Sequence, residues 1–251
     1  MNVSAFPTPS RTPVDPLELY AAAIDTSDYV LRVVPQVRRL VPTIGRLLDV
    51  GAGGGQLGAA LQDHTFGWTA IEPSPAMCGR LARLHVPPRI VAGRWEEAWV
   101  SPAAHDTVIA ATMPALFDHP EAFLARCRDW ARRAVVWVVP AQAGPRGLIF
   151  AGCLPGEWHR EDETPGVDLV LGRLGAESRP DAVAFVEWTF SGVTQDLSRL
   201  AAYLADRLGW PPDDERRPQL REHLQSQAKP DAAGLRLDIA RKSAVLVWRL
   251  A

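Results

Sequence analysis

Between residues 46 and 139, short runs of β-branched and other apolar residues alternate with amphipathic stretches. The apolar runs are typical of buried strands and occupy residues 46–50, 68–72, 89–92, 106–111 and 134–139. The intervening stretches that have helical spacing cover residues 55–63, 75–85 and 120–131. Because parallel strands need crossover connections, this alternation predicts an α/β fold with a doubly wound, mostly parallel sheet and helices on both faces.

The segments that precede this alternation are predicted to lie outside the sheet. Residues 1–13 are rich in Pro, Ser and Thr and are predicted to be a mobile leader. Residues 14–44 carry apolar side chains at spacings of three and four, which predicts an N-terminal helical cap that is broken at Pro35 and Pro42. The rest of the chain, 45–251, is predicted to be one α/β domain.

Beyond Pro140 the pattern is less regular before further elements begin. Helices are expected over 167–174, 195–208 and 214–228, and a strand over 182–190. The final residues indicate two strands, LRLDI at 235–239 and SAVLVWRL at 243–250, which are consistent with a hairpin at the sheet edge.

Charge and cysteine content exclude several classes of protein. The 27 basic and 29 acidic residues give a net charge of -2, so no concentrated positive field is available for nucleic acid. Three widely spaced cysteines predict no metal site. The longest apolar run, 134–141, is too short to span a bilayer, so no membrane partner is expected and a cytoplasmic location is favoured. A local basic patch is interpreted as a solvated helix face, with contact to RNA or phosphate as the alternative; it comprises Arg32, Arg38, Arg39 and Arg46.

A glycine cluster follows the first predicted strand, in the segment LLDVGAGGGQLGAAL at residues 47–61. A strand that passes through glycines into a helix presents backbone N–H groups and the positive helix end to a polar or anionic ligand. Four glycines within residues 51–55 are costly unless something must approach the backbone closely. The segment therefore predicts a ligand site rather than a simple turn.

Two ligand fingerprints compete for this loop. Gly53, Gly55 and Gly58 satisfy the GxGxxG pattern of dinucleotide sites, in which the first glycine follows the strand almost at once. Here Gly53 comes three residues after the predicted strand. The alternative is an acid followed by glycines at every second position. This pattern is matched at each position by Asp49, Gly51, Gly53 and Gly55.

This second pattern resembles the first motif of the class I S-adenosylmethionine-dependent methyltransferases, in particular those of type 11. The second predicted strand ends in Glu72 and Pro73, and the family uses a carboxylate at that point to bind the two ribose hydroxyls. The resemblance implies a seven-stranded Rossmann-like sheet with S-adenosylmethionine as cofactor. It also implies that Gly51 and Gly53 face the cofactor's amino-acid portion, while Asp49 organises the loop or the cofactor's amine.

The third motif of this family departs from its usual form. Gly93 fits, but Arg94 stands where the family has an acid and Trp95 where it has a small residue. Glu96 or the Trp95 backbone could hold the adenine with the Trp95 ring over its face, and packing of that ring against the sheet is the alternative. After the fourth strand, Thr112 occupies the floor of the family's methyl-transfer site. The cofactor residues implied by the resemblance are Asp49, Gly51, Ala52, Gly53, Gly55, Glu72, Pro73, Trp95, Glu96 and Thr112.

Aromatic residues outside the central alternation predict the acceptor site. The chain has nine tryptophans, a high count for 251 residues. A largely aromatic pocket is predicted between the cap and the C-terminal elements. Its residues would be Tyr20, Tyr29 and Trp158, with Trp188 and Trp210 in the same region.

Residue His159 is the candidate for a catalytic role. It would act as a general base, or with Glu161 it would grip a metal-bound or cationic acceptor; the alternative is a solvated acidic loop. Methyl transfer from a sulfonium mainly needs alignment, so a base is not required.

Methylation of a small molecule is the function that these features favour. An RNA or protein methyltransferase is disfavoured because the chain reads ATMPALF after the fourth strand, where an amide-holding motif would stand. A cofactor-binding partner or sensor without turnover is a further alternative. A nicotinamide oxidoreductase is disfavoured by the register of the glycines.

Overall fold

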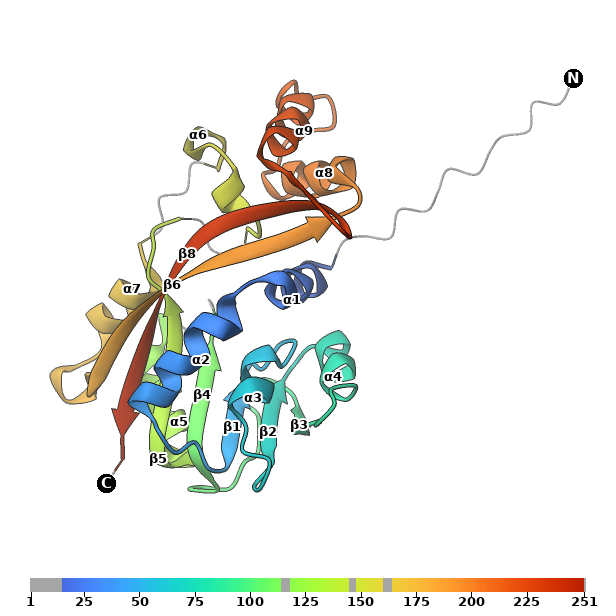
Figure 1. Cartoon of the computed structure of the whole chain (residues 1–251). Coiled ribbons are helices and arrows are strands. Elements are labelled where there is room, and N and C mark those ends of the chain that lie inside the picture. The colour runs from blue at the N-terminus through green and yellow to red at the C-terminus, as the bar shows by residue number, and fades with distance from the viewer. Residues whose placement is uncertain (1–14, 114–117, 145–147, 160–163, 251) are drawn as a thin grey trace, which may run out of the picture.

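The computed structural model describes residues 15–113, 118–144, 148–159 and 164–250, so the predicted leader at 1–13 and Glu161 lie outside the described part. Its core is one sheet in the order β3-β2-β1-β4-β5-β8-β6, with the short β7 paired with β8 (Figure 1). Strands β1 to β5 are parallel, and β8 is antiparallel to both of its long neighbours. The α/β fold with a mostly parallel sheet is therefore confirmed. The strands are β1 Leu47–Val50, β2 Trp68–Glu72, β3 Arg89–Ala92, β4 His105–Ala111, β5 Ala131–Pro140, β6 Ala182–Thr194, β7 Lys229–Asp231 and β8 Gly234–Arg249.

Helices cover both faces of the sheet because the buried strands are apolar on both sides. In β1, Leu47 packs into the cluster under α2 and α3, whereas Leu48 and Val50 pack into the cluster under α5 and α7. This arrangement is expected for a parallel sheet that is buried on both faces. The helices are α1 Pro16–Thr26, α2 Tyr29–Leu40, α3 Gln56–Leu61, α4 Pro75–Leu81, α5 Pro120–Trp130, α6 Gly156–His159, α7 Gly166–Arg173, α8 Leu197–Arg207 and α9 Arg216–Gln227.

The predicted break at Pro35 is wrong, because α2 continues through that residue. A proline inside a helix removes the hydrogen bond to the carbonyl four residues earlier. That carbonyl belongs to Leu31, which is 73% exposed, so water can solvate it. The chain instead breaks at Ser27 and Asp28, between α1 and α2.

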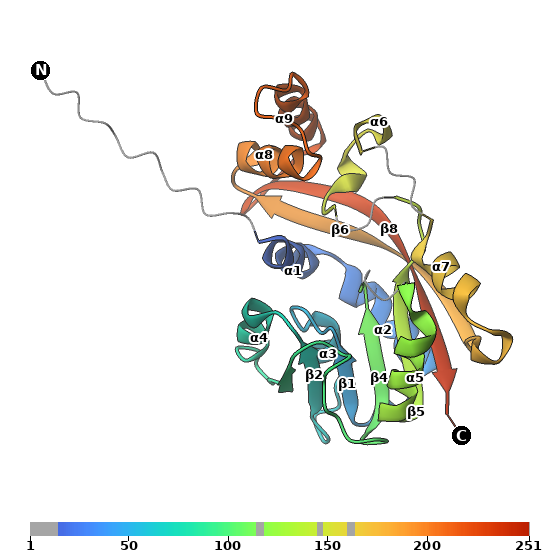
Figure 2. The same ribbon diagram turned by 180° about the vertical axis from the view of Figure 1, so that it is seen from behind.

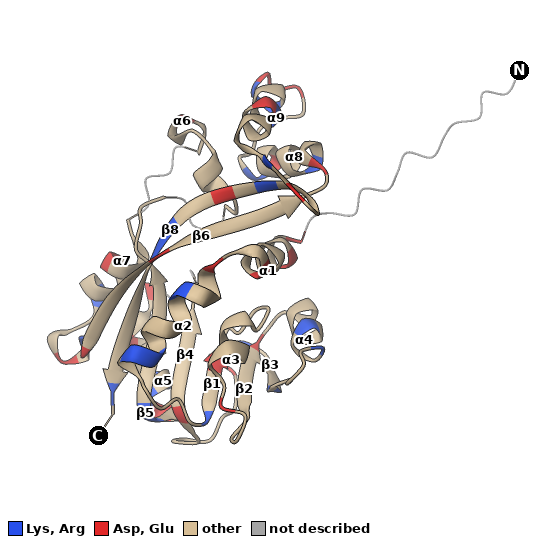
Figure 3. Ribbon diagram, viewed as in Figure 1, with Lys and Arg blue, Asp and Glu red and all other residues tan. Residues whose placement is uncertain are grey.

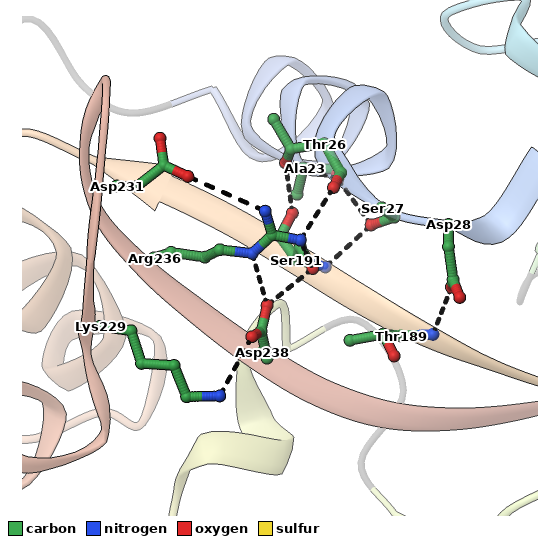
Figure 4. Close-up of polar contacts among 10 residues, drawn as sticks. All are labelled: Ala23, Thr26, Ser27, Asp28, Thr189, Ser191, Lys229, Asp231, Arg236 and Asp238. Carbon is green, nitrogen blue, oxygen red and sulfur yellow. Dashed lines mark hydrogen bonds and ion pairs between the residues drawn. The ribbon is translucent and has the colours of Figure 1, made fainter.

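The break lies at this point because the α1–α2 junction covers the free edge of β6 (Figure 4). The backbone N–H of Thr189 donates to Asp28 Oδ1 at 2.6 Å, and that of Ser191 donates to Ser27 Oγ at 2.8 Å. The Thr26 hydroxyl donates to the Ser191 carbonyl at 2.6 Å. These bonds satisfy backbone groups of Thr189 and Ser191 that would otherwise be open to pairing with another chain. Ion pairs and hydrogen bonds continue the network into β7 and β8 through Lys229, Asp231, Arg236 and Asp238.

The predicted C-terminal hairpin is also wrong. LRLDI and SAVLVWRL are parts of one strand, β8, which lies between β5 and β6 instead of at an edge. No turn residue separates the two segments, and the residues between them keep pairing with β6, Arg241 opposite Trp188. The chain turns earlier, where Asp231 of β7 pairs with Gly234, whose φ is +144°.

Strands β6 and β8 project well beyond the end of β5. Pairing with β5 involves residues 243–249 of β8, whereas pairing with β6 involves residues 235–247. The projecting ribbon carries α8 and α9 on one face, and α1 lies on the other (Figures 1 and 2). The molecule therefore has a compact parallel half and an extended antiparallel half.

Candidate functional site

The glycine loop leaves β1 through three residues in the left-handed region. Gly51, Gly53 and Gly55 have φ values of +66°, +54° and +82°. A Cβ on Gly51 would collide with the Met113 side chain at the end of β4, so that glycine is needed for packing. A Cβ on Gly53 would have no atom within 4 Å, so its open side faces space that the protein does not fill. Gly53 is thus the point of the loop that a ligand can approach most closely.

Next to this loop, the Glu72 carboxylate is fixed by two backbone groups. It is only 5% exposed, and its Oε2 accepts a hydrogen bond from the Gly53 N–H at 2.8 Å. Its Oε1 accepts one from the Ser74 N–H at the same distance. An ionised carboxylate can accept about four hydrogen bonds, so both oxygens keep acceptor capacity for a ligand. The structure therefore brings Glu72 and the glycine loop together.

Asp49 lies behind the loop, under the first turns of α3. It is 3% exposed, and its Oδ2 would be 2.5 Å from a Cβ on Gly58. Burial raises the pKa of Asp49 to about 7, the charge of Glu72 acts in the same direction, and a hydrogen bond from the Gly58 backbone opposes them. Gly58 therefore leaves room for a carboxylate that supports the loop from within the core.

Thr112, at the end of β4, holds an unusual backbone conformation. Its φ is +52°, and its N–H donates to the Val138 carbonyl at 3.0 Å. A β-branched residue rarely adopts the left-handed region, which costs about 1 to 3 kcal/mol. Its side chain bonds the Tyr20 hydroxyl of α1; burial raises the pKa of Tyr20, and this bond and the charge of Arg241 oppose the rise. The carboxyl end of β4 is thereby joined to α1.

A cavity of about 270 Å³ opens from this contact into the antiparallel half. Tyr20 and Thr112 border it together with the end of β5, while β6 contributes Trp188 and Phe190 and β8 contributes Arg241. The sequence prediction missed Phe190 and Arg241. The alternation of β6 would have placed Trp188 and Phe190 on one face, and Arg241 stands with Lys242 directly before an apolar run.

The other predicted acceptor residues do not border this cavity. Tyr29 is buried beside it, with its ring centre 4.7 Å from that of Trp188. Trp158 packs against Trp210 in the antiparallel half, at a centroid distance of 5.7 Å. His159 follows in the same short helix, α6, and is likewise not among the residues that line the cavity.

The residues after β3 are arranged differently from the usual family motif. The Trp95 ring packs edge-on against Phe123 at a centroid distance of 5.2 Å. Glu96 forms an exposed ion pair with Arg94 at 3.2 Å, and this bond lowers the pKa of Glu96. Both residues therefore have partners within the protein. Of the two roles considered for the Trp95 ring, packing within the protein is the one that this contact fits. Of the remaining predicted residues, Ala52 donates its N–H to the Ile71 carbonyl at 3.2 Å.

Within the described ranges, no group of three or more His, Cys, Asp or Glu side chains has the arrangement needed to hold a metal ion. None of the helices described is long and apolar enough to cross a membrane.

Comparison with known proteins gives matches at the level of structure. No family model and no curated protein matches the sequence. A proposed type II methyltransferase from Anaeromyxobacter dehalogenans superposes with a TM-score of 0.54 at 18% identity, over 86% of this chain and 94% of that one. A proposed methyltransferase from Bacillus halodurans gives 0.50 at 13% identity, over 86% and 97%.

A third similar structure comes from Anabaena variabilis and is a proposed methyltransferase from an antibiotic biosynthesis pathway. It gives a TM-score of 0.50 at 16% identity, over 86% of this chain and 96% of that one. Each of the three superpositions covers 86% of this chain. The strand order β3-β2-β1-β4-β5-β8-β6, in which β8 is antiparallel to its neighbours, agrees with this likeness. The chain has the fold of the class I S-adenosylmethionine-dependent methyltransferases.

Proposed function

We propose that this protein binds S-adenosylmethionine at the glycine loop and transfers its methyl group to a small molecule held in the cavity. The observation that carries the proposal is the open side of Gly53 next to the fixed carboxylate of Glu72. The first provides room for a ligand against the backbone, and the second provides oxygens that can accept hydrogen bonds from two ribose hydroxyls. When bound, the cofactor would supply an electrophilic methyl group on a sulfonium.

In this proposal the parallel half holds the cofactor, with Glu72 as the ribose-binding residue and Gly51 to Gly53 beside the amino-acid portion. Asp49 supports the loop from below. Thr112 would lie between cofactor and acceptor, since it ends β4 and also borders the cavity. Ligands of open α/β sheets bind at this carboxyl edge.

Helix α1 closes the site from above. Asp25 of α1 forms an ion pair with Arg80 of α4, and Gln56 donates to both Asp25 Oδ1 and the Ala21 carbonyl at 2.9 Å. These contacts hold α1 against the N-terminal end of α3, while Tyr20 reaches Thr112. Exclusion of water and alignment of the acceptor are the main contributions that the chain's own residues would make.

A small acceptor is supported by the cavity volume of about 270 Å³ and by the near-neutral charge of the chain. The similar protein from Anabaena variabilis, which is assigned to an antibiotic biosynthesis pathway, points in the same direction. Aromatic rings line the cavity, those of Tyr20, Trp188 and Phe190, and such walls suit a small, largely apolar molecule.

Calorimetric titration with S-adenosylhomocysteine and, separately, with NAD tests the cofactor assignment. We expect binding of S-adenosylhomocysteine only; binding of NAD alone would contradict the proposal. Transfer of a labelled methyl group to members of a metabolite library then separates an enzyme from a sensor. Tight cofactor binding without transfer to any acceptor would favour the sensor.

A further inference from the structure

Arg241 is a cation on the wall of the cavity that has no anionic partner among the described residues. It lies opposite Trp188, where β8 passes from its charged projecting half to the uncharged stretch between β5 and β6 (Figure 3). The side chain is partly buried, and its guanidinium carbon is 5.8 Å from the centre of the Phe190 ring. Burial lowers the pKa of Arg241, while Tyr20 and Cys153 oppose the shift.

Across the part of the chain that the structure describes, no carboxylate pairs with this guanidinium, and its neighbours are an aromatic ring, a phenol and a thiol. Arg236, five residues earlier in the same strand, shows the contrast, because its Nε donates to Asp238 at 2.8 Å. An arginine stays charged at physiological pH and offers five N–H donors. A partly buried charge without a partner is unfavourable, so the anion is expected to come from a ligand.

The surroundings of Arg241 indicate the shape of that ligand. The rings of Tyr20 and Phe190 lie 5.8 Å apart with planes 26° from parallel. The Trp188 indole is fixed because its N–H donates to Ser243 Oγ at 3.0 Å. No residue of the glycine loop lines this cavity, so Arg241 borders a different space from the loop that is proposed to hold the cofactor's amino-acid portion.

We infer that Arg241 binds a carboxylate of the acceptor, so that the substrate is a flat, largely apolar acid. The inference rests on the proposed function, because it takes the occupant of the cavity to be the methyl acceptor. A carboxylate can accept two parallel N–H bonds from a guanidinium while its ring packs on Phe190 and Trp188. The neighbouring cation, Lys242, also borders the cavity, but its ammonium lies 5.2 Å from the centre of the exposed Phe185 ring.

The test compares 2-naphthoate with 2-naphthamide, which share a ring system but differ in charge. Calorimetric titration of the wild-type chain should show the acid binding about tenfold or more tightly than the amide. Arg241→Gln should bring this ratio close to one, while Arg241→Lys should keep part of it, because lysine retains the charge without the planar fork. Lys242→Gln is the matched control and should keep the full ratio.

A ratio near one in the wild type would overturn the inference, as would a ratio that survives Arg241→Gln or is lost equally in Lys242→Gln. If Arg241→Gln does not fold, the wild-type ratio and Arg241→Lys decide the matter. Titration with S-adenosylhomocysteine separates this inference from the proposed function. A matching loss of its affinity in the Arg241 variants would assign the residue to the cofactor carboxylate and overturn the inference. Absence of its binding to the wild type, with the acid preference intact, would instead contradict the proposed function alone.

Discussion

The two halves of the sheet present their ligand-facing groups in different ways. In the parallel half, strands of four to seven residues, β1 to β4, end in tight loops, and the candidate site is made of backbone at Gly51 to Gly53 with one buried carboxylate. In the antiparallel half, β6 and β8 have 13 and 16 residues, and their side chains form the wall of the cavity. A site built from backbone suits a constant ligand, whereas one built from side chains on long strands can change with the acceptor.

The largest expected effect comes from filling the open side of Gly53. Gly53→Val should lower the affinity for S-adenosylhomocysteine by about 100-fold or more, since a side chain would occupy the ligand's space. Gly67→Val is the matched control, because Gly67 has a φ of +67° and a Cβ added to it would likewise have no atom within 4 Å. Both variants should lose a similar free energy of unfolding, about 1 to 3 kcal/mol. Calorimetry that shows equal affinities in the two variants would remove the loop from the binding site.

The next effect tests the carboxylate of the parallel half. Glu72→Ala should weaken S-adenosylhomocysteine binding by about 1 to 3 kcal/mol, because hydrogen bonds to a charged group are lost. The exposed Glu187 of β6 provides the control, and Glu187→Ala should leave the affinity unchanged. An unaltered affinity in the Glu72 variant would mean that the ribose is held elsewhere.

A third prediction concerns how the buried Asp49 of the parallel half makes the free energy of unfolding depend on pH. Its folded pKa of about 7 lies above the unfolded value of 3.8, so its contribution to the free energy of unfolding is fully present below pH 3.8 and is lost as the pH rises towards and through 7. Asp49→Asn removes this titration. Between pH 5 and pH 8 the variant should gain on the order of 2 kcal/mol relative to the wild type in denaturant unfolding. A difference that does not change with pH would contradict the raised pKa.

The smallest effect is expected where α1 joins the two halves. Asp25→Ala breaks the exposed pair with Arg80, which contributes at most about 1 kcal/mol. We expect S-adenosylhomocysteine affinity to fall only a few-fold, with faster proteolysis of α1. Asp118→Ala removes a comparable exposed pair with Arg173 at 3.2 Å and should change neither property. The same change in both variants would show that α1 does not close the site.

The parallel half was more predictable from the sequence than the antiparallel half, for a physical reason. Its strands and glycine turns are specified locally, by runs of apolar residues and by backbone conformations that only glycine readily adopts. The contact between Gly53 and Glu72 follows from the adjacency of β1 and β2. The loop after β3 is the exception, because Trp95 packs on Phe123 of α5, a contact distant in the sequence.

In the antiparallel half, contacts between distant residues decide the structure. The α1–α2 break depends on Ser27 and Asp28 meeting the β6 edge, more than 160 residues away in sequence. The position of β8 between β5 and β6, instead of at an edge, is likewise not specified by any local pattern. Tyr20 was predicted at the acceptor pocket and does border the cavity. The role of Arg241 could not be predicted, because it depends on the lack of an anionic partner among the described residues.

The central claim is that the two halves bind two different molecules. It is tested most directly by reciprocal calorimetry, with S-adenosylhomocysteine titrated into Arg241→Gln and 2-naphthoate titrated into Gly53→Val. We predict wild-type affinity in both titrations, because each substitution lies outside the other ligand's site. Loss of either affinity would mean that the cofactor and the acid share one site, and would contradict the account.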